Sequence, residues 1–147
     1  MHREPLTNWM NPQANLVFVG DACHPMLPYL AQGASSSIED GAVLGLLLHP
    51  SRFFSKLHLW QTLQLFQELR QARGEAITKE TIRQRKELHL RDRIMQRYWD
   101  DMFGKRLGKE EEVQSDPHEF PSPWTCPDMQ AWLYGYDAVK EVEGLPR

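Results

Sequence analysis

The hydrophobic positions near the start of the chain predict one short buried strand followed by a loop. Residues 15–19 (Asn-Leu-Val-Phe-Val) form an apolar run, partly β-branched, that stops at Gly20. A short run that is apolar on both faces is typical of an interior strand, so we predict a strand over these residues. Pro25 and Pro28 follow, and because proline interrupts regular structure they predict a loop.

A helix is predicted to begin at Ser36. Ser36 and Glu39 have the spacing of a capping box, in which each side chain bonds a backbone N–H of the first helical turn. The apolar residues that follow recur at helical spacing and predict one buried face, made of Ile38, Ala42, Val43 and Leu46. Pro50 is expected to end this helix.

The sequence divides into three stretches of different character: residues 1–50, 51–108 and 109–147. The second is predicted to be helical almost throughout, because apolar residues recur every three or four positions at Leu59, Leu63, Phe66 and Leu69, and later at Ile94, Tyr98 and Met102. Gly104 and Gly108 are the expected helix ends. The third is a Pro-rich tail, expected to be irregular up to an aromatic segment at residues 129–134.

Composition and charge exclude several classes of protein. The 147 residues are 41% hydrophobic and 25% charged, which is typical of a folded chain, and the net charge of -3 gives no field that attracts nucleic acid. Bases outnumber acids 13 to 7 in residues 51–108, but the signs alternate as in a salt-bridged, solvent-exposed helix. No apolar run can cross a membrane and no signal-peptide pattern is present, so a cytoplasmic protein without an integral membrane segment is expected.

The segment Gly20–Ser35 carries the candidate chemistry. It places Asp21 directly after the predicted strand and Gly33 shortly before the predicted helix. In open α/β sheets ligands bind at this edge, where a carboxylate accepts hydrogen bonds from ligand hydroxyls and a helix start offers N–H donors. Gly33 also lets backbone approach a flat ligand closely. On the pattern alone, the alternative is an ordinary turn in which Asp21 has no ligand.

Other catalytic and metal-binding arrangements have less support. Cys23 and His24 resemble a nucleophile and its base, but neighbours on an extended chain point to opposite faces, so we expect His24 to be a hydrogen-bonding loop residue. Residues 33–37 lack the Gly-x-Ser-x-Gly turn of hydrolases. The six histidines have no metal-ligand spacing, and the two cysteines make no disulfide framework, so no metal site is predicted.

The same loop resembles the second flavin-contacting motif of the FAD-dependent aromatic hydroxylases, in particular the fungal salicylate-hydroxylase-like monooxygenases. The match runs Leu-Val-Phe-Val-Gly-Asp-Ala-Cys-His-Pro-Met-Leu-Pro-Tyr-Leu-Ala-Gln-Gly-Ala, then Ile-Glu-Asp-Gly-Ala-Val-Leu-Gly. Residues 66–73 resemble the long helix of that family, and residues 132–138 resemble the C-terminal signature of its fungal branch. The Gly-x-Gly-x-x-Gly motif that binds the FAD pyrophosphate in the family is absent from this sequence.

The resemblance implies an α/β, Rossmann-like FAD-binding fold, of which this chain would be a mostly α-helical C-terminal fragment with at most one or two short strands. Residues 1–50 would be the last piece of the FAD-binding domain. The implied enzyme is an FAD-dependent monooxygenase that hydroxylates an aromatic or polyketide-like small molecule with NAD(P)H and O2. The chain alone is expected to be inactive. The alternative is a non-catalytic remnant or a helical module that binds a partner, through self-association or with a separate N-terminal half.

The resemblance also assigns roles to particular residues. Asp21, after Gly20, would hydrogen-bond the ribityl chain of FAD. The backbone N–H groups of Gly33, Ala34 and Ser35 would face the flavin pyrimidine ring, although the family usually has asparagine where Ser35 stands. Pro28 would lie beside the reactive face of the flavin, next to the aromatic substrate, and is the catalytic candidate. No metal is implied.

Overall fold

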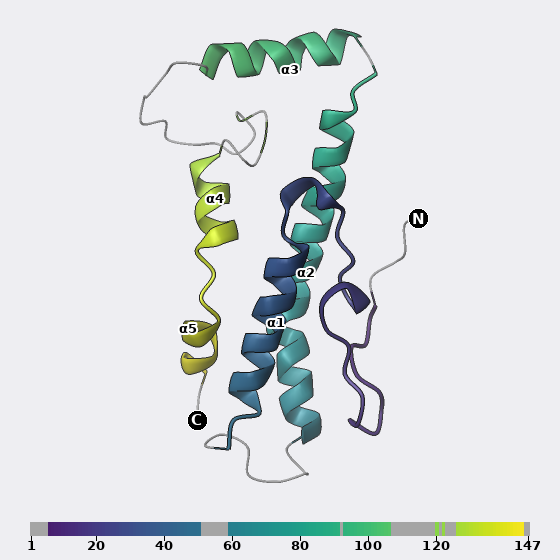
Figure 1. The fold of residues 1–147 in the computed structure, drawn as a ribbon, viewed down its shortest axis with the longest axis vertical. Coiled ribbons are helices and arrows are strands. Elements are labelled where there is room, and N and C mark those ends of the chain that lie inside the picture. The colour runs from purple at the N-terminus through teal and green to yellow at the C-terminus, as the bar shows by residue number, and fades with distance from the viewer. Residues whose placement is uncertain are drawn as a thin grey trace. The chain divides into compact units, whose positions relative to one another are not determined.

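The computed structural model describes residues 6–50, 59–91, 93–106, 120, 122 and 126–145. In order along the chain these residues form two short 3₁₀ turns, η1 (Gly20–Ala22) and η2 (Pro28–Leu30), and the helices α1 (Gly33–Leu47), α2 (Leu59–Leu88), α3 (Arg93–Arg106), α4 (Pro127–Tyr134) and α5 (Ala138–Glu143) (Figure 1). The expectation of a mostly α-helical chain is confirmed. None of the described helices is both long enough and apolar enough to span a membrane.

The chain forms two compact units. One consists of Met1–Ile82 together with Asp137–Arg147, and the other of Arg83–Tyr136. The first unit contains α1, α5, both 3₁₀ turns and the greater part of α2. It therefore holds every residue that the resemblance assigns to the cofactor.

The predicted strand over residues 15–19 is wrong. Its described residues make one isolated antiparallel bridge, Met10–Val17, within a tight hairpin. The Phe18 N–H donates to the Trp9 carbonyl oxygen (2.7 Å), and the Asn11 side chain closes the turn. A strand needs a neighbour along its whole length, and no other described segment pairs with residues 15–19. Leu16 is accordingly 51% exposed instead of buried.

Helix α1 begins at Gly33, three residues earlier than predicted, and the predicted capping box is wrong. Its N-cap is Gln32, whose side chain makes no capping hydrogen bond. The buried positions of α1 recur at helical spacing but include two polar residues: Ser36, Asp40, Val43 and Leu47. The apolar face was therefore predicted correctly at Val43 and wrongly at Ile38, which is 72% exposed, and at Ala42, which is also exposed, because polar side chains occupy the face that packs inward.

Helix α2 confirms the long helix predicted from the apolar spacing, and it lies beside α1 (Figure 1). Its buried stripe mixes apolar and polar residues: Leu63, Phe66, Arg70, Arg73, Ile77 and Thr81. The Trp9 side chain packs edge-on against Phe66, with ring centroids 5.8 Å apart, and the Trp9 N–H donates to the Gln67 side chain at 2.9 Å. These contacts fix the N-terminal hairpin to α2.

The tail forms more helix than the sequence predicted. Helix α5 was not expected at all; the Asp137 side chain caps it by accepting from the Val139 and Lys140 N–H groups, which lower the pKa of that carboxyl. Helix α5 packs against α1, where Val142 is buried. A six-residue helix of this kind has too short an apolar pattern to stand out in the sequence.

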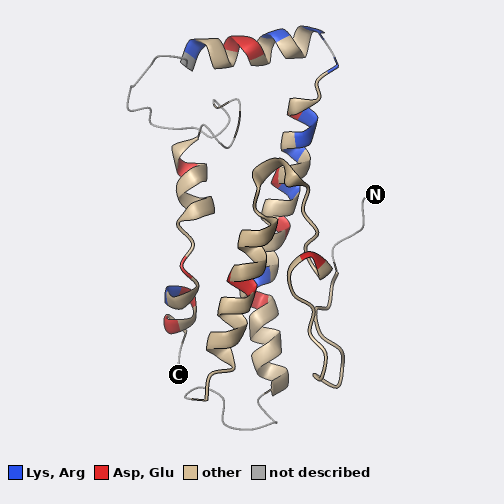
Figure 2. Ribbon diagram, viewed as in Figure 1, with Lys and Arg blue, Asp and Glu red and all other residues tan. Residues whose placement is uncertain are grey.

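In the second unit, α3 runs through Gly104, so the predicted helix end there is wrong, while Gly108 lies outside the described residues. A glycine inside a helix lowers the stability of the helix but does not by itself end it. The predicted alternation of charge is seen near the end of α2 (Figure 2), where Arg83 and Glu87 form an ion pair one turn apart. Helix α4 begins at Pro127 and contains the whole predicted aromatic segment, residues 129–134, with Leu133 buried and Trp132 exposed.

Candidate functional site

The turn that carries Asp21 packs tightly against α1. Gly20 has φ of +59°, and a Cβ at this position would lie 2.6 Å from the Ser37 Oγ, so any other residue here would be strained and would displace the Ser37 side chain. Asp21 follows with an exposed side chain. A Cβ built on Gly33 would lie 3.8 Å from Asp21 Oδ1. The structure thus brings the Gly20–Asp21 pair beside Gly33 at the first turn of α1, although Gly33 lies 12 positions after Asp21 in the chain.

The start of α1 offers hydrogen-bond donors beside this carboxylate. The first helical bond runs from the Ser36 N–H to the Gln32 carbonyl oxygen (2.9 Å), and no side chain of the N-cap residue caps the helix. The N–H groups of residues 33–35 precede that bond and have no acceptor within the helix. Ala34 and Ser35 are exposed. An acceptor and a row of donors near the positive end of a helix therefore lie side by side.

Pro28 lies on the loop between Asp21 and Gly33. It begins η2 and is exposed, and this turn ends at Ala31, which has φ of 52°. The Leu27 N–H donates to the Thr81 hydroxyl of α2 (3.3 Å), while Leu30 is buried. Pro28 is thus held at the surface on a loop that is anchored on both sides.

Behind the loop lies a group of ionisable residues, most of them buried, here called the Asp40 cluster, whose members are His24, Glu39, Asp40, Arg70 and Arg73. Asp40 Oδ2 accepts from the Gly20 N–H (2.8 Å) and lies 2.6 Å from His24 Nε2, while Asp40 Oδ1 accepts from Arg70 Nε (2.8 Å). Glu39 accepts from both arginines, at 2.7 Å from Arg70 and 2.9 Å from Arg73. Figure 2 shows acidic and basic positions on neighbouring stretches of the α1 and α2 ribbons.

The charges of the Asp40 cluster balance: two carboxylates face two guanidinium groups. The side chains of Asp40 and Arg70 are both 0% exposed. Burial by itself raises the pKa of Asp40, but hydrogen bonds from His24, Arg70 and the Gly20 N–H outweigh it, so this pKa lies below its ordinary value. Asp40 is therefore a buried anion whose partners come from two separate segments, the turn Gly20–His24 and helix α2.

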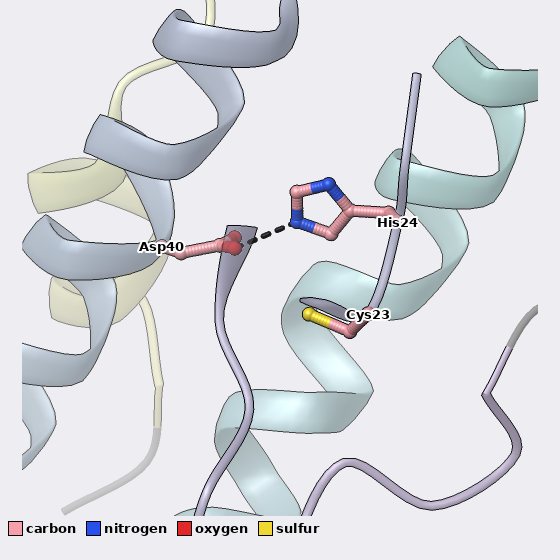
Figure 3. A group of neighbouring side chains, drawn as sticks. All are labelled: Cys23, His24 and Asp40. Carbon is pink, nitrogen blue, oxygen red and sulfur yellow. Dashed lines mark hydrogen bonds and ion pairs between the residues drawn. The ribbon is translucent and has the colours of Figure 1, made fainter. Parts of the chain in front are cut away.

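The expectation that Cys23 and His24 point to opposite faces is wrong. Both follow a 3₁₀ turn instead of lying on an extended chain, and ligand atoms of Cys23, His24 and Asp40 lie within 4.8 Å of one another (Figure 3). Burial and the charge of Asp40 raise the pKa of the Cys23 thiol to about 12, so the thiol of the metal-free protein is protonated and is not a nucleophile. The thiol donates instead to the Gly20 carbonyl oxygen (3.3 Å).

The predicted role of His24 as a hydrogen-bonding loop residue is confirmed, but the cluster around it was missed. Patterns of hydrophobicity assign Asp40, Arg70 and Arg73 to the surface. The one signal in the sequence is the spacing of the arginines, which continue the apolar stripe of α2 from Leu63 and Phe66. A charged residue in a buried register position indicates a buried partner of opposite charge.

The packing of His24 gives a testable prediction about Gly74 on α2. A Cβ at Gly74 would lie 3.0 Å from His24 Cδ2, and His24 cannot retreat because Asp40 holds its ring. Alanine favours a helix interior over glycine by about 1 kcal/mol, but overpacking costs about 1–3 kcal/mol. Gly74→Ala should therefore destabilise the unaltered chain but stabilise a chain that already carries His24→Ala. The measurement is urea unfolding of the unaltered chain, the two single variants and the double variant. A stabilising Gly74→Ala in the unaltered chain would contradict this packing.

The site is of the kind in which a glycine–aspartate turn lies beside an uncapped helix start. It suits a ligand with both hydroxyl and carbonyl groups, because the carboxylate accepts from hydroxyls and the helix N–H groups donate to carbonyls. Several known proteins are similar to this chain over most of its length. The chain is 43% identical over 139 residues to the FAD-dependent monooxygenase OpS4 of Beauveria bassiana (strain ARSEF 2860), an alignment that covers 95% of this chain and 30% of that protein. It is 31% identical over 141 residues to the FAD-dependent monooxygenase notI of Aspergillus sp. (strain MF297-2), covering 95% and 26%.

A solved structure agrees in fold. The crystal structure of CtdE in complex with FAD and substrate 4 matches 96% of this chain and 28% of its own chain, with a TM-score of 0.61 at 24% identity. No family model matches the sequence. The chain is a relative of part of the FAD-dependent monooxygenases, which confirms the resemblance found in its sequence. It spans less than a third of the length of the relatives described here.

Proposed function

We propose that this chain supplies part of the FAD site of a monooxygenase that hydroxylates an aromatic or polyketide-like small molecule with NAD(P)H and O2. The observation that carries the proposal is the position of the Asp21 carboxylate beside the uncapped start of α1, in a chain related to FAD-dependent monooxygenases. The residues present fit the flavin. Its ribityl hydroxyls need an acceptor, and the carbonyl groups of its ring need donors.

In this proposal each residue has a separate task. Asp21 accepts hydrogen bonds from the ribityl hydroxyls, and Gly20 allows the turn that presents it. The N–H groups of Gly33, Ala34 and Ser35 donate to the ring carbonyls, and the positive end of α1 stabilises negative charge on the ring that it faces. FAD, when bound, supplies the redox and oxygen chemistry. Pro28, on its anchored loop, limits the space in which the aromatic substrate lies.

Binding of a protein partner is the second candidate function. It is favoured by exposed apolar side chains in the first unit, namely Leu16, Phe18, Val19 and Ile38. Such side chains on a small unit are typical of a surface that another polypeptide covers. The partner would be a second copy of the chain or a separate polypeptide that carries the remaining FAD contacts.

The test is a titration of the whole chain with FAD, followed by flavin fluorescence and by the absorbance of the bound flavin. We expect saturable but weak binding, lost on gel filtration, because the sequence has no Gly-x-Gly-x-x-Gly segment to hold the pyrophosphate. Riboflavin should bind with similar affinity, since it shares the ribityl and ring groups. Absence of saturable binding by either flavin would reject the proposed function and leave partner binding as the better candidate.

A further inference from the structure

One carboxylate holds both ends of the turn that presents Asp21. Asp40 Oδ2 accepts a hydrogen bond from the Gly20 N–H at the start of η1 (2.8 Å). The same oxygen lies 2.6 Å from Nε2 of His24, just after the end of η1. Asp21 lies between these two anchors. The other oxygen, Oδ1, accepts a hydrogen bond from Arg70 Nε of α2 (2.8 Å). The loop and α2 are thus bonded to different oxygens of the same side chain.

The peptide groups of the turn leave it little freedom. The Gly20 carbonyl oxygen accepts from the Cys23 N–H (3.0 Å) and the His24 N–H (3.1 Å), while the Gly20 N–H is bonded to Asp40. Ser37 stands where any Cβ on Gly20 would lie. Both hydrogen-bonding groups of Gly20 are therefore used, one within the turn and one by Asp40.

We propose that Asp40 is a positioning residue for Asp21: it fixes the turn Gly20–His24 so that the Asp21 carboxylate stays beside the start of α1. Asp40 would not touch the cofactor itself. Its role would be to prevent the turn from sampling other conformations, so that binding does not have to order Asp21. This inference rests on the proposed FAD site.

The substitution Asp40→Asn separates the loop contacts from the α2 contact. The asparagine oxygen can still accept from Arg70 Nε, but its NH₂ group then faces the Gly20 N–H, donor against donor. The His24 ring can adapt, because its buried Nδ1 makes no hydrogen bond in the described part of the chain and can take the proton from Nε2. The bond that cannot be remade is the one to Gly20.

Glu39→Gln is the matched control. It removes the same charge from the neighbouring residue. Within the described part of the chain, Glu39 bonds Arg70 and Arg73 and forms no hydrogen bond or ion pair with the turn. Both variants should lower the stability of the chain. Only Asp40→Asn should act on the turn.

The experiment measures amide hydrogen exchange and FAD affinity in the whole chain. In Asp40→Asn we expect exchange at Gly20, Cys23 and His24 to accelerate more than exchange in α2, and FAD affinity to fall about tenfold, the cost of 1.4 kcal/mol. We also expect Asp21→Ala combined with Asp40→Asn to bind FAD no more weakly than Asp21→Ala alone, since a positioning residue has nothing left to position. In Glu39→Gln, exchange should change uniformly and FAD affinity should not fall.

Several results would overturn the inference. They are unchanged FAD affinity in a folded Asp40→Asn variant, additive losses in the double variant, and acceleration spread evenly over the turn and α2. If Asp40→Asn does not fold, His24→Ala removes one anchor of the turn without leaving a charge unpaired. It should show a smaller loss, again non-additive with Asp21→Ala, and full affinity there would overturn the inference too. If even the unaltered chain binds no FAD, the proposed function fails, while acceleration confined to the turn still supports Asp40 as its anchor.

Discussion

Replacing Arg70 with alanine should lower the free energy of unfolding by about 3–5 kcal/mol, because it leaves buried carboxylates without a counter-charge. The Arg70 side chain is 0% exposed and bonds both Asp40 and Glu39. Small domains have unfolding free energies of about 5–15 kcal/mol in total. We therefore expect this variant to be largely unfolded or to have a much reduced midpoint in urea, measured by far-UV circular dichroism.

A surface arginine provides the control for this prediction. Arg83 forms an ion pair with Glu87 one turn further along α2, but its side chain is 44% exposed. Exposed pairs of this kind contribute about 0.3–0.5 kcal/mol, so Arg83→Ala should shift the urea midpoint only slightly. Equal losses in the two variants would show that Arg70 is not buried against its carboxylates in solution.

Replacing Asp21 with alanine should weaken FAD binding by about tenfold or more. A hydrogen bond to a charged group contributes about 1.5–3 kcal/mol, and each 1.4 kcal/mol corresponds to a factor of ten. Because Asp21 is exposed, the substitution should leave the urea midpoint of the chain almost unchanged. Affinity would be measured by the same fluorescence titration for both proteins.

The matched control for Asp21 is Asp101, an exposed aspartate on α3 in the second unit. Asp101→Ala changes the net charge by the same amount but should leave FAD affinity as it is. If the two variants lose affinity equally, the loss reflects overall charge. If neither loses affinity, Asp21 does not belong to the flavin site.

The parts of the fold that could be predicted depend on contacts local in sequence. Helix α2 was predicted because its apolar residues recur at every turn. The strand predicted at residues 15–19 depends on contacts that are distant in sequence, because an apolar run becomes a strand only where neighbouring strands pair with it. The described residues of this run form only one hairpin bridge. The start of α1 was misplaced because its N-cap residue makes no side-chain bond, and an uncapped start leaves little trace in the sequence.

The candidate site also has a part that the sequence predicts and a part that it does not. Resemblance to a known motif assigned Asp21 and Gly33 to one ligand, and the structure places them together. Nothing in the sequence pairs Asp40 with Gly20, His24 and Arg70, because those partners are 16 to 30 positions away and hydrophobic patterns assign charged residues to the surface. The contacts that hold the loop could therefore be found only in three dimensions.

The Asp40 cluster also constrains how this sequence can change over evolutionary time. The loss of one of its charges leaves a buried charge without a partner, which is strongly destabilising. Exchanging the whole buried ion group for apolar residues of similar volume is often neutral or stabilising. Residues 39, 40, 70 and 73 are therefore expected to change as a set, and a library that varies them one at a time should recover little besides the present residues. A library that varies them jointly should find apolar combinations that still fold. Those combinations would lack an acceptor for the Gly20 N–H, so selection for folding alone would lose the charges, and only selection for the ligand would keep Asp40.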